Sequence, residues 1–282
     1  MPPSATALLP ARPLLRRAAR GLARTLGALA LFGAGIGGTA AAQTPVQALA
    51  PEQLPDFLAA HEIAVVQFTS PESKCGYCVG ADRPFDQVAA LSVDPRRAYA
   101  RVQWQPWRQF PAFPAGIQIT KIPLMQVYVR GQLAGQYDGR PSHPSDLSMR
   151  VWESVMTLRA AQSPLEPGKP LTPAQRRQTQ AFVRASHLHS LLIDCAHRSP
   201  EQLPLYQSAM KRGLKPVQAD LEGAMRLSDT NPDRWPELPE IAQALLKQRQ
   251  AWISRTLGQA EAPMNEQRCV KLAQAIDQWP MP

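Results

Sequence analysis

The sequence predicts an α/β domain followed by an all-helical domain, and three observations support this prediction. A short apolar, β-branched run at residues 64–69 is followed by Cys75-x-x-Cys78 and then by apolar residues at helical spacing. A Pro-rich stretch at residues 162–171 has the composition of an extended linker. Beyond it, apolar residues recur at helical spacing. The predicted organisation is a signal peptide (1–42), an α/β domain (43–161), a linker (162–171) and a helical domain (172–282).

Residues 1–42 have the composition of a secretory signal peptide. Five arginines and no acidic residue or lysine lie in this segment, and the arginines precede an apolar run at residues 26–36. Ala40, Ala41 and Ala42 then form a small-residue cleavage site. We expect export to the periplasm, where disulfides persist, with cleavage near Ala42. The alternative is an uncleaved signal that anchors the protein to the inner membrane.

The basic charge does not indicate a nucleic-acid-binding protein. The chain has a formal net charge of +9 and an isoelectric point near 9.8. The five arginines of the signal segment account for more than half of that excess, and without them the net charge is +4. No basic run occurs elsewhere, so we expect no nucleic-acid partner.

Further elements are expected on both sides of the linker. Before it, the pattern predicts a helix near 50–58, a helix at 79–91, a strand at 99–104, a hairpin with strands at 124–129 and 133–137, and a helix at 146–161. After it, Thr172 and Pro173 mark a helix start, and further helices are expected after Ser199 and at 216–227, 239–257 and 263–278.

The cysteine pair is the candidate functional centre. Cys75 falls at the expected N-terminus of a helix, where backbone N–H groups and the helix dipole stabilise a thiolate, and Lys74 adds a full positive charge. We therefore predict Cys75 as the attacking nucleophile and Cys78 as the resolving thiol. The alternatives are an inert local disulfide and half of a zinc site, although the chain has no second C-x-x-C.

The order strand, C-G-Y-C, helix, strand, then Ile122-Pro123 before a hairpin and a closing helix resembles the thioredoxin fold. Phe68 resembles the strand-ending aromatic of that family, and Gly131 and Gly139 fall where its hairpin glycines lie. The resemblance covers roughly residues 50–161 and implies a central mixed sheet flanked by helices. It also implies a cis-proline at Pro123 beside the cysteines, with Ile122, Tyr77 and Lys74 helping to position the substrate.

The resemblance is mixed as to the type of thiol exchange. Gly76-Tyr77 resembles the pair between the cysteines of periplasmic disulfide isomerases, whereas Ile122 before the proline resembles the reducing thioredoxins. Gln67 stands where thioredoxins have a buried aspartate that helps to move the proton. Proton transfer at Cys78 must then use water or another group such as Glu72.

The remaining two cysteines, Cys195 and Cys269, lie on predicted amphipathic helices, and we expect a structural disulfide between the first and last helices of the helical domain. His187, His189 and His197 lie nearby. Residues two apart on a helix point to different faces, so His187 and His189 do not readily share an ion, and we expect no metal site.

The leading hypothesis is a periplasmic thiol–disulfide oxidoreductase, of reductase or isomerase type, that acts on protein disulfides through Cys75 and Cys78. It needs no cofactor beyond this redox-active pair. Its expected partners are proteins with disulfides or thiols and a membrane electron donor, and the helical domain could bind a client or partner protein. The alternative is a non-enzymatic assembly factor with a thioredoxin-like fold, in a cell-envelope apparatus such as a secretion or conjugation system.

Overall fold

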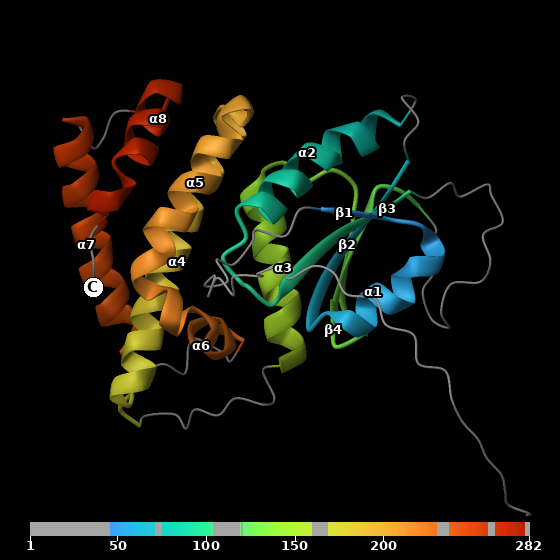
Figure 1. Cartoon of the computed structure of the whole chain (residues 1–282), viewed down its shortest axis with the longest axis horizontal. Coiled ribbons are helices and arrows are strands. Elements are labelled where there is room, and N and C mark those ends of the chain that lie inside the picture. The colour runs from blue at the N-terminus through green and yellow to red at the C-terminus, as the bar shows by residue number, and fades with distance from the viewer. Residues whose placement is uncertain are drawn as a thin grey trace, which may run out of the picture. The chain divides into compact units, whose positions relative to one another are not determined.

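The structure is a computed structural model that describes residues 46–70, 75–103, 119, 121–159, 169–229, 237–258 and 263–279. All of these residues fall within one compact unit, Ala41–Pro282. A sheet with helices on its faces forms the first part of this unit, and a group of helices from α4 onward forms the second (Figure 1).

The sheet has five strands in the order β1-β3-β2-β4-β5. Strands β1, β3 and β2 run parallel, whereas β4 pairs antiparallel with both β2 and β5. The strands are β1 (Gln47–Leu49), β2 (Ile63–Thr69), β3 (Arg97–Gln103), β4 (Leu124–Val129) and β5 (Gln132–Asp138). Arg130 and Gly131 both have positive φ and form the tight turn between β4 and β5, as expected for a two-residue hairpin.

The two faces of the sheet are covered by different helices. Successive side chains of β2 alternate between the faces, which is the period of a strand. Ala64, Val66 and Phe68 pack with helix α1 (Leu54–Ala60), which a short 3-10 turn, Pro51–Gln53, precedes. Ile63 and Val65 pack with α2 (Gly76–Ala90) and α3 (Pro144–Arg159) on the other face. Gln67 and Thr69 are therefore directed toward the same face as the cysteine-bearing helix.

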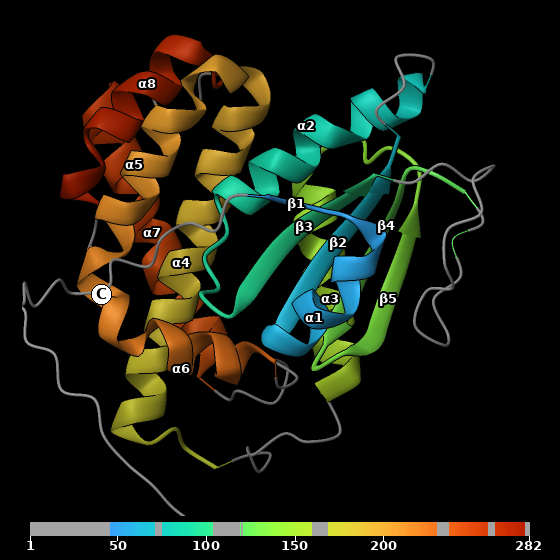
Figure 2. The same ribbon diagram turned by 45° about the vertical axis from the view of Figure 1, so that its right-hand side comes forward.

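The second part consists of the α-helices that follow α3, and the first of them contacts both α2 and α3 (Figures 1 and 2). They are α4 (Pro173–Arg198), α5 (Leu203–Leu214), α6 (Gln218–Ser228), α7 (Leu238–Leu257) and α8 (Glu266–Gln274). The Thr172 hydroxyl accepts a hydrogen bond from the N–H of Gln175 at 3.2 Å, and the Gln175 side chain accepts from the Thr172 N–H at 2.9 Å. This capping box explains why the longest helix begins at Pro173.

The sheet and the helical region share one apolar core. A continuous cluster of buried side chains runs from Val65 and Phe85 through Leu188 to Trp252. At the boundary, the buried Gln87 amide of α2 donates a hydrogen bond of 2.6 Å to the carbonyl oxygen of Ala196 in α4. Helix α2 is thus fixed on one side by the sheet and on the other by α4.

Most of the expected elements are present, with small shifts at their ends, and the predicted fold class is confirmed. Strand β1 was not predicted, because three residues with only Leu49 buried leave no periodic pattern to detect. The cysteine-bearing helix was predicted to begin at residue 79, three residues after its observed start at Gly76. The predicted signal peptide lies outside the described residues, as does most of the predicted linker. Among the helices that are described, none is long and apolar enough to cross a membrane.

A disulfide joins Cys195 of α4 to Cys269 of α8, with Cα atoms 5.5 Å apart. Both side chains are fully buried. Because it closes a loop of 74 residues in sequence separation, its main contribution is to restrict the unfolded chain.

Replacing this disulfide by alanines, as Cys195→Ala with Cys269→Ala, is expected to lower the free energy of unfolding by about 4 kcal/mol. Urea unfolding followed by circular dichroism measures the change. The matched control is Cys75→Ala with Cys78→Ala, whose short loop restricts the unfolded chain much less. An equal loss of stability for the two double variants would contradict this account.

A buried ion cluster also joins the sheet to the helical region. Arg96, just before β3, forms ion pairs of 2.7 Å with both Asp94 and Asp229, the latter at the end of α6. Burial alone would raise the pKa of Asp94, but the hydrogen bonds from Arg96 and the charges of Arg97 and Arg96 outweigh it and hold that pKa below its usual value of 3.8.

The variant Asp94→Asn is expected to lose about 3 kcal/mol of stability at pH 7, because it leaves buried cations less well paired. The lowered pKa of Asp94 stabilises the fold above the unfolded-state pKa, and this stabilisation disappears as the pH falls through the folded-state value. The difference between wild type and variant should therefore shrink in urea unfolding at acid pH. The control Asp220→Asn removes a partly exposed ion partner of Arg177 and is expected to change stability by less than about 1 kcal/mol. A gap that stays constant with pH would refute the assignment.

Candidate functional site

Cys75 and Cys78 form a disulfide at the N-terminus of α2, with Cα atoms 5.2 Å apart. Cys75 is the N-cap residue, and its Sγ accepts a hydrogen bond from the N–H of Cys78 at 3.3 Å. The Cys75 carbonyl accepts from the N–H groups of Cys78 and Val79 at 3.0 and 3.2 Å. Cys75 is partly exposed, whereas Cys78 is fully buried.

This arrangement gives the two sulfurs different chemistry. When the disulfide is reduced, the N–H of Cys78 and the positive end of the helix dipole are placed to stabilise a thiolate on Cys75. The exposure of Cys75 gives a substrate access to this sulfur. Cys78, buried one turn inside, is placed to attack a disulfide formed on Cys75. The roles of nucleophile for Cys75 and resolving thiol for Cys78 stay predictions.

The other predicted site residues are placed as follows. The Ile122–Pro123 peptide bond is cis, and the Pro123 carbonyl accepts a hydrogen bond from the N–H of Gly139 at 2.9 Å. Pro123 lines the same cavity as Ala81, which is one helical turn after Cys78. Tyr77, between the cysteines, is 75% exposed. Lys74 lies outside the described residues, so its predicted role is untested.

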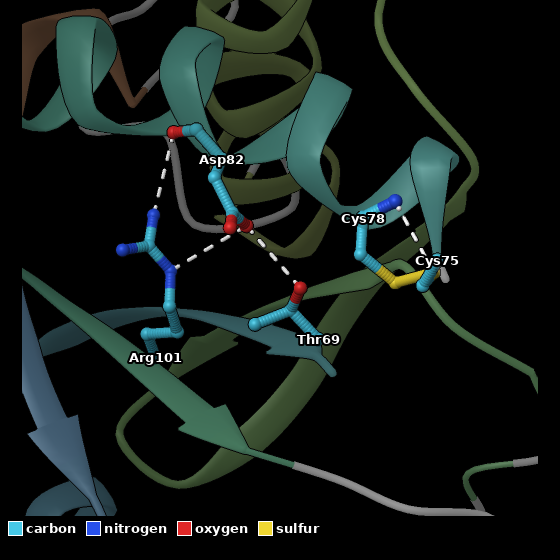
Figure 3. Close-up of a disulfide and its surroundings, with 5 residues drawn as sticks. All are labelled: Thr69, Cys75, Cys78, Asp82 and Arg101. Atoms are coloured by element: carbon cyan, nitrogen blue, oxygen red, sulfur yellow. Dashed lines mark hydrogen bonds and ion pairs between the residues drawn. A yellow bond between two sulfur atoms is a disulfide. The ribbon is translucent and has the colours of Figure 1, made fainter. Parts of the chain in front are cut away.

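A polar network lies to one side of the cysteine pair, between α2 and the strands (Figure 3). Asp82 accepts a hydrogen bond of 3.2 Å from the Thr69 hydroxyl and lies 3.7 Å from Nε of Arg101. Arg101 also donates to Gln67 Oε1 at 2.9 Å and to Asp86 Oδ1 at 2.8 Å. The network connects the strand position of Gln67 to two carboxyl groups on the helix.

Asp82 was not predicted as a site residue. Glu72, which was predicted as a possible proton acceptor, lies outside the described residues. Asp82 follows Cys78 by four residues, so the two side chains share one face of the helix. Figure 3 shows both side chains directed from α2 toward the strands. The i, i+4 spacing was the available signal, but only the structure shows that this face is directed toward Thr69 and Arg101.

The histidines form no metal site in the described part of the chain, where no group of three or more histidine, cysteine or acidic side chains is placed to hold an ion. Burial, together with the charge of Arg249, lowers the pKa of His187. Burial and the charge of Arg97 lower the pKa of His189 to about 4. Both side chains are therefore neutral at pH 7. The His197 ring instead packs against His143, with ring centroids 4.2 Å apart.

Comparisons with known proteins give only distant matches. No protein-family model and no curated protein matches the chain. Among solved structures, it is similar to a thioredoxin of Malassezia sympodialis, with 17% identity over 39% of this chain and 90% of that chain and a TM-score of 0.30. It is also similar to thioredoxin F from spinach chloroplast, with 13% identity over 41% of this chain and 89% of that chain and a TM-score of 0.32.

The fold class follows from the chain's own topology. A mixed sheet in the order β1-β3-β2-β4-β5, flanked by α1 on one face and by α2 and α3 on the other, has a cysteine pair at the N-terminus of α2. This is a thioredoxin-like α/β fold, and helices α4 to α8 follow it in sequence.

Proposed function

We propose that this protein is a thiol–disulfide oxidoreductase that acts on protein disulfides through Cys75 and Cys78. The single observation that carries the proposal is the partly exposed Cys75 at the N-terminus of α2, with the buried Cys78 one turn behind it. An inert bridge would not need one accessible sulfur at a helix end that stabilises its thiolate.

In the reducing direction, the Cys75 thiolate attacks one sulfur of a substrate disulfide, and the substrate S–S bond breaks as a mixed disulfide forms. The first substrate thiolate leaves and takes a proton from solvent. Cys78 then loses its proton and attacks Sγ of Cys75, which releases the second substrate thiolate. The protein dithiol is oxidised to the disulfide by two electrons, and the substrate disulfide is reduced by the same two.

The compartment and the direction of electron flow are further parts of the proposal. The composition of residues 1–42 supports export to the periplasm, and the buried Cys195–Cys269 disulfide is compatible with an oxidising compartment. A net reductase or isomerase there needs its own supply of electrons, so we propose a membrane electron donor as a partner.

The purified protein is expected to reduce insulin disulfides or to isomerise scrambled ribonuclease in the presence of a thiol donor. Cys75→Ser is expected to abolish this activity, because Cys78, the other sulfur in the first turn of α2, is fully buried. Turbidity of the insulin B chain and recovered ribonuclease activity are the measurements. Activity that survives the substitution would sink the proposal.

Cys78→Ser provides the matched test of the resolving role. This variant should retain substrates as covalent adducts that dithiothreitol releases, because the mixed disulfide on Cys75 is no longer resolved. If wild type and variant instead capture the same proteins equally and reversibly, the protein acts as a binding or assembly factor and not through thiol exchange.

In the resolving step the Cys78 proton passes to water or to a side chain, and we propose that Asp82 accepts it. Gln67 cannot act as this base, because an amide does not titrate near neutral pH. Asp82 lies one turn beyond Cys78 on the same helix face and is one-third exposed, so it exchanges protons with solvent. Thr69 and Arg101 hold its carboxylate in place.

Asp82→Asn is expected to lengthen the lifetime of the mixed disulfide by about tenfold or more, because general base assistance is lost. Quenched-flow alkylation of a Cys75 mixed disulfide measures this lifetime. Asp86→Asn is the control, because Asp86 also pairs with Arg101 but lies a further turn from Cys78. Equal effects of the two substitutions, or no effect of the first, would exclude this role.

A further inference from the structure

A cavity of about 190 Å³ lies between α2, α3, the start of β4 and the end of β5, and Ala81, one helical turn after Cys78, is part of its wall. Its inner wall is mainly apolar and includes the buried side chains of Phe85, Met125 and Leu147. Its outer wall is polar and contains two arginines, Arg140 and Arg150. The cis-proline Pro123 also lines it.

The two carboxylates that line this cavity already have partners. Asp138 forms an ion pair with Lys121. Asp146 accepts hydrogen bonds from the Ser142 hydroxyl and, at 3.2 Å, from the N–H of His143. The hydrogen bond from Ser142 contributes most to the lowering of the pKa of Asp146. The Asp146 carboxylate is therefore ionised at neutral pH and already has hydrogen-bond partners. Because both carboxylates already have partners, they do not fully neutralise the positive charges of Arg140 and Arg150.

Arg140 is the arginine that remains available. The guanidinium of Arg150 stacks over the Tyr137 ring, 5.2 Å from its centroid. Arg140, by contrast, has no hydrogen-bond or ion-pair partner among the described residues. An exposed arginine beside an apolar cavity is suited to bind a carboxylate, because its planar fork of donors matches the two oxygens.

The position of Arg140 depends on the absence of a side chain at Gly80. A Cβ at Gly80 would lie 2.7 Å from Cδ and 3.0 Å from Nε of Arg140, so the arginine occupies the space that a side chain would fill. A side chain at Gly80 would cover the turn of α2 that precedes it. Because Arg140 occupies this space, Arg140 lies over the first turns of α2. Gly80 is five residues after Cys75, roughly 7 Å along the helix axis.

We infer that this cavity is a binding site for a carboxylate that the disulfide substrate bears close to its reactive sulfur, with Arg140 as its anion-binding residue. The inference rests on the proposed function and adds a substrate class to it. The carboxylate could belong to an acidic side chain of a protein client or to a small acidic thiol compound, and both present the same chemistry to Arg140. The apolar wall accommodates the short aliphatic arm that joins the carboxylate to the sulfur.

Three small disulfides of similar size but different charge test this inference on the full-length protein. They are 3,3′-dithiodipropionate, which is anionic, bis(2-hydroxyethyl) disulfide, which is neutral, and cystamine, which is cationic. The protein is reduced with dithiothreitol, desalted and mixed with each disulfide. Acid quenching and mass spectrometry give the second-order rate constant for formation of the Cys75 mixed disulfide. The readout is the ratio of the anionic to the neutral rate constant.

Arg140→Gln is expected to lower this ratio by about three- to fivefold, as for a partly exposed charge pair, and Arg140→Lys should restore part of it. The ratio in wild type should also fall with added salt. Arg83→Gln is the matched control: it removes the same charge from exposed Arg83 of α2, outside the cavity, and should leave the ratio unchanged.

The same wild-type ratio in Arg140→Gln would overturn the inference, because any general effect on the Cys75 thiolate cancels in the ratio. So would an equal fall in Arg83→Gln, which would indicate only long-range attraction. If the rate constants of the small acidic and neutral disulfides differ, but acidic peptides that carry a mixed disulfide show no such difference from neutral ones, the site selects small thiol compounds and not protein clients. If wild type reacts with none of the three disulfides, the proposed function itself fails, and the inference fails with it.

Discussion

The position of helix α2 is the constraint on which the candidate site depends. The N-terminus of α2 can stabilise a thiolate on Cys75 only if the helix is fixed in position and the Cys75 sulfur is accessible. Two interactions achieve this: Phe85 and Val88 pack against the sheet, and the Gln87 amide is hydrogen-bonded to α4 at Ala196. A buried amide that lost this partner would retain an uncompensated donor, so the hydrogen bond opposes separation of α2 from α4.

This constraint connects the helical region to the chemistry. Ala196, which receives the hydrogen bond from Gln87, directly follows Cys195, and Cys195 is joined to Cys269 of α8. The segment that supports α2 is therefore itself fastened to the last helix of the described chain. The Arg96 cluster adds a second connection, between the start of β3 and the end of α6. A helical region joined to α2 in this way directly supports the position of α2.

Much of this arrangement was predictable from local pattern, because period and turn chemistry act over a few residues. The apolar run of β2, the hairpin turn at Arg130 and Gly131, and the Thr172 cap all depend on near neighbours. The connections between segments were not predictable in this way. Arg96 and Asp229 are 133 residues apart, and nothing in the spacing of either one indicates the other. Arg140 was likewise unremarkable in sequence, since its importance depends on the space beside Gly80.

Gln67 is the residue at which the sequence departs from the thioredoxin pattern, and the structure gives this departure a physical meaning. A carboxylate at this buried position, 3% exposed, would require burial of a charge within the sheet face. With glutamine there, Arg101 still has a partner on β2, but its charge is balanced by Asp82 and Asp86 on the helix. In the proposed mechanism, the acid–base group has thus moved from the strand to the helix that bears the cysteines. A base on α2 keeps its relation to Cys78 whenever the helix shifts as a whole, and its partial exposure lets water return the proton.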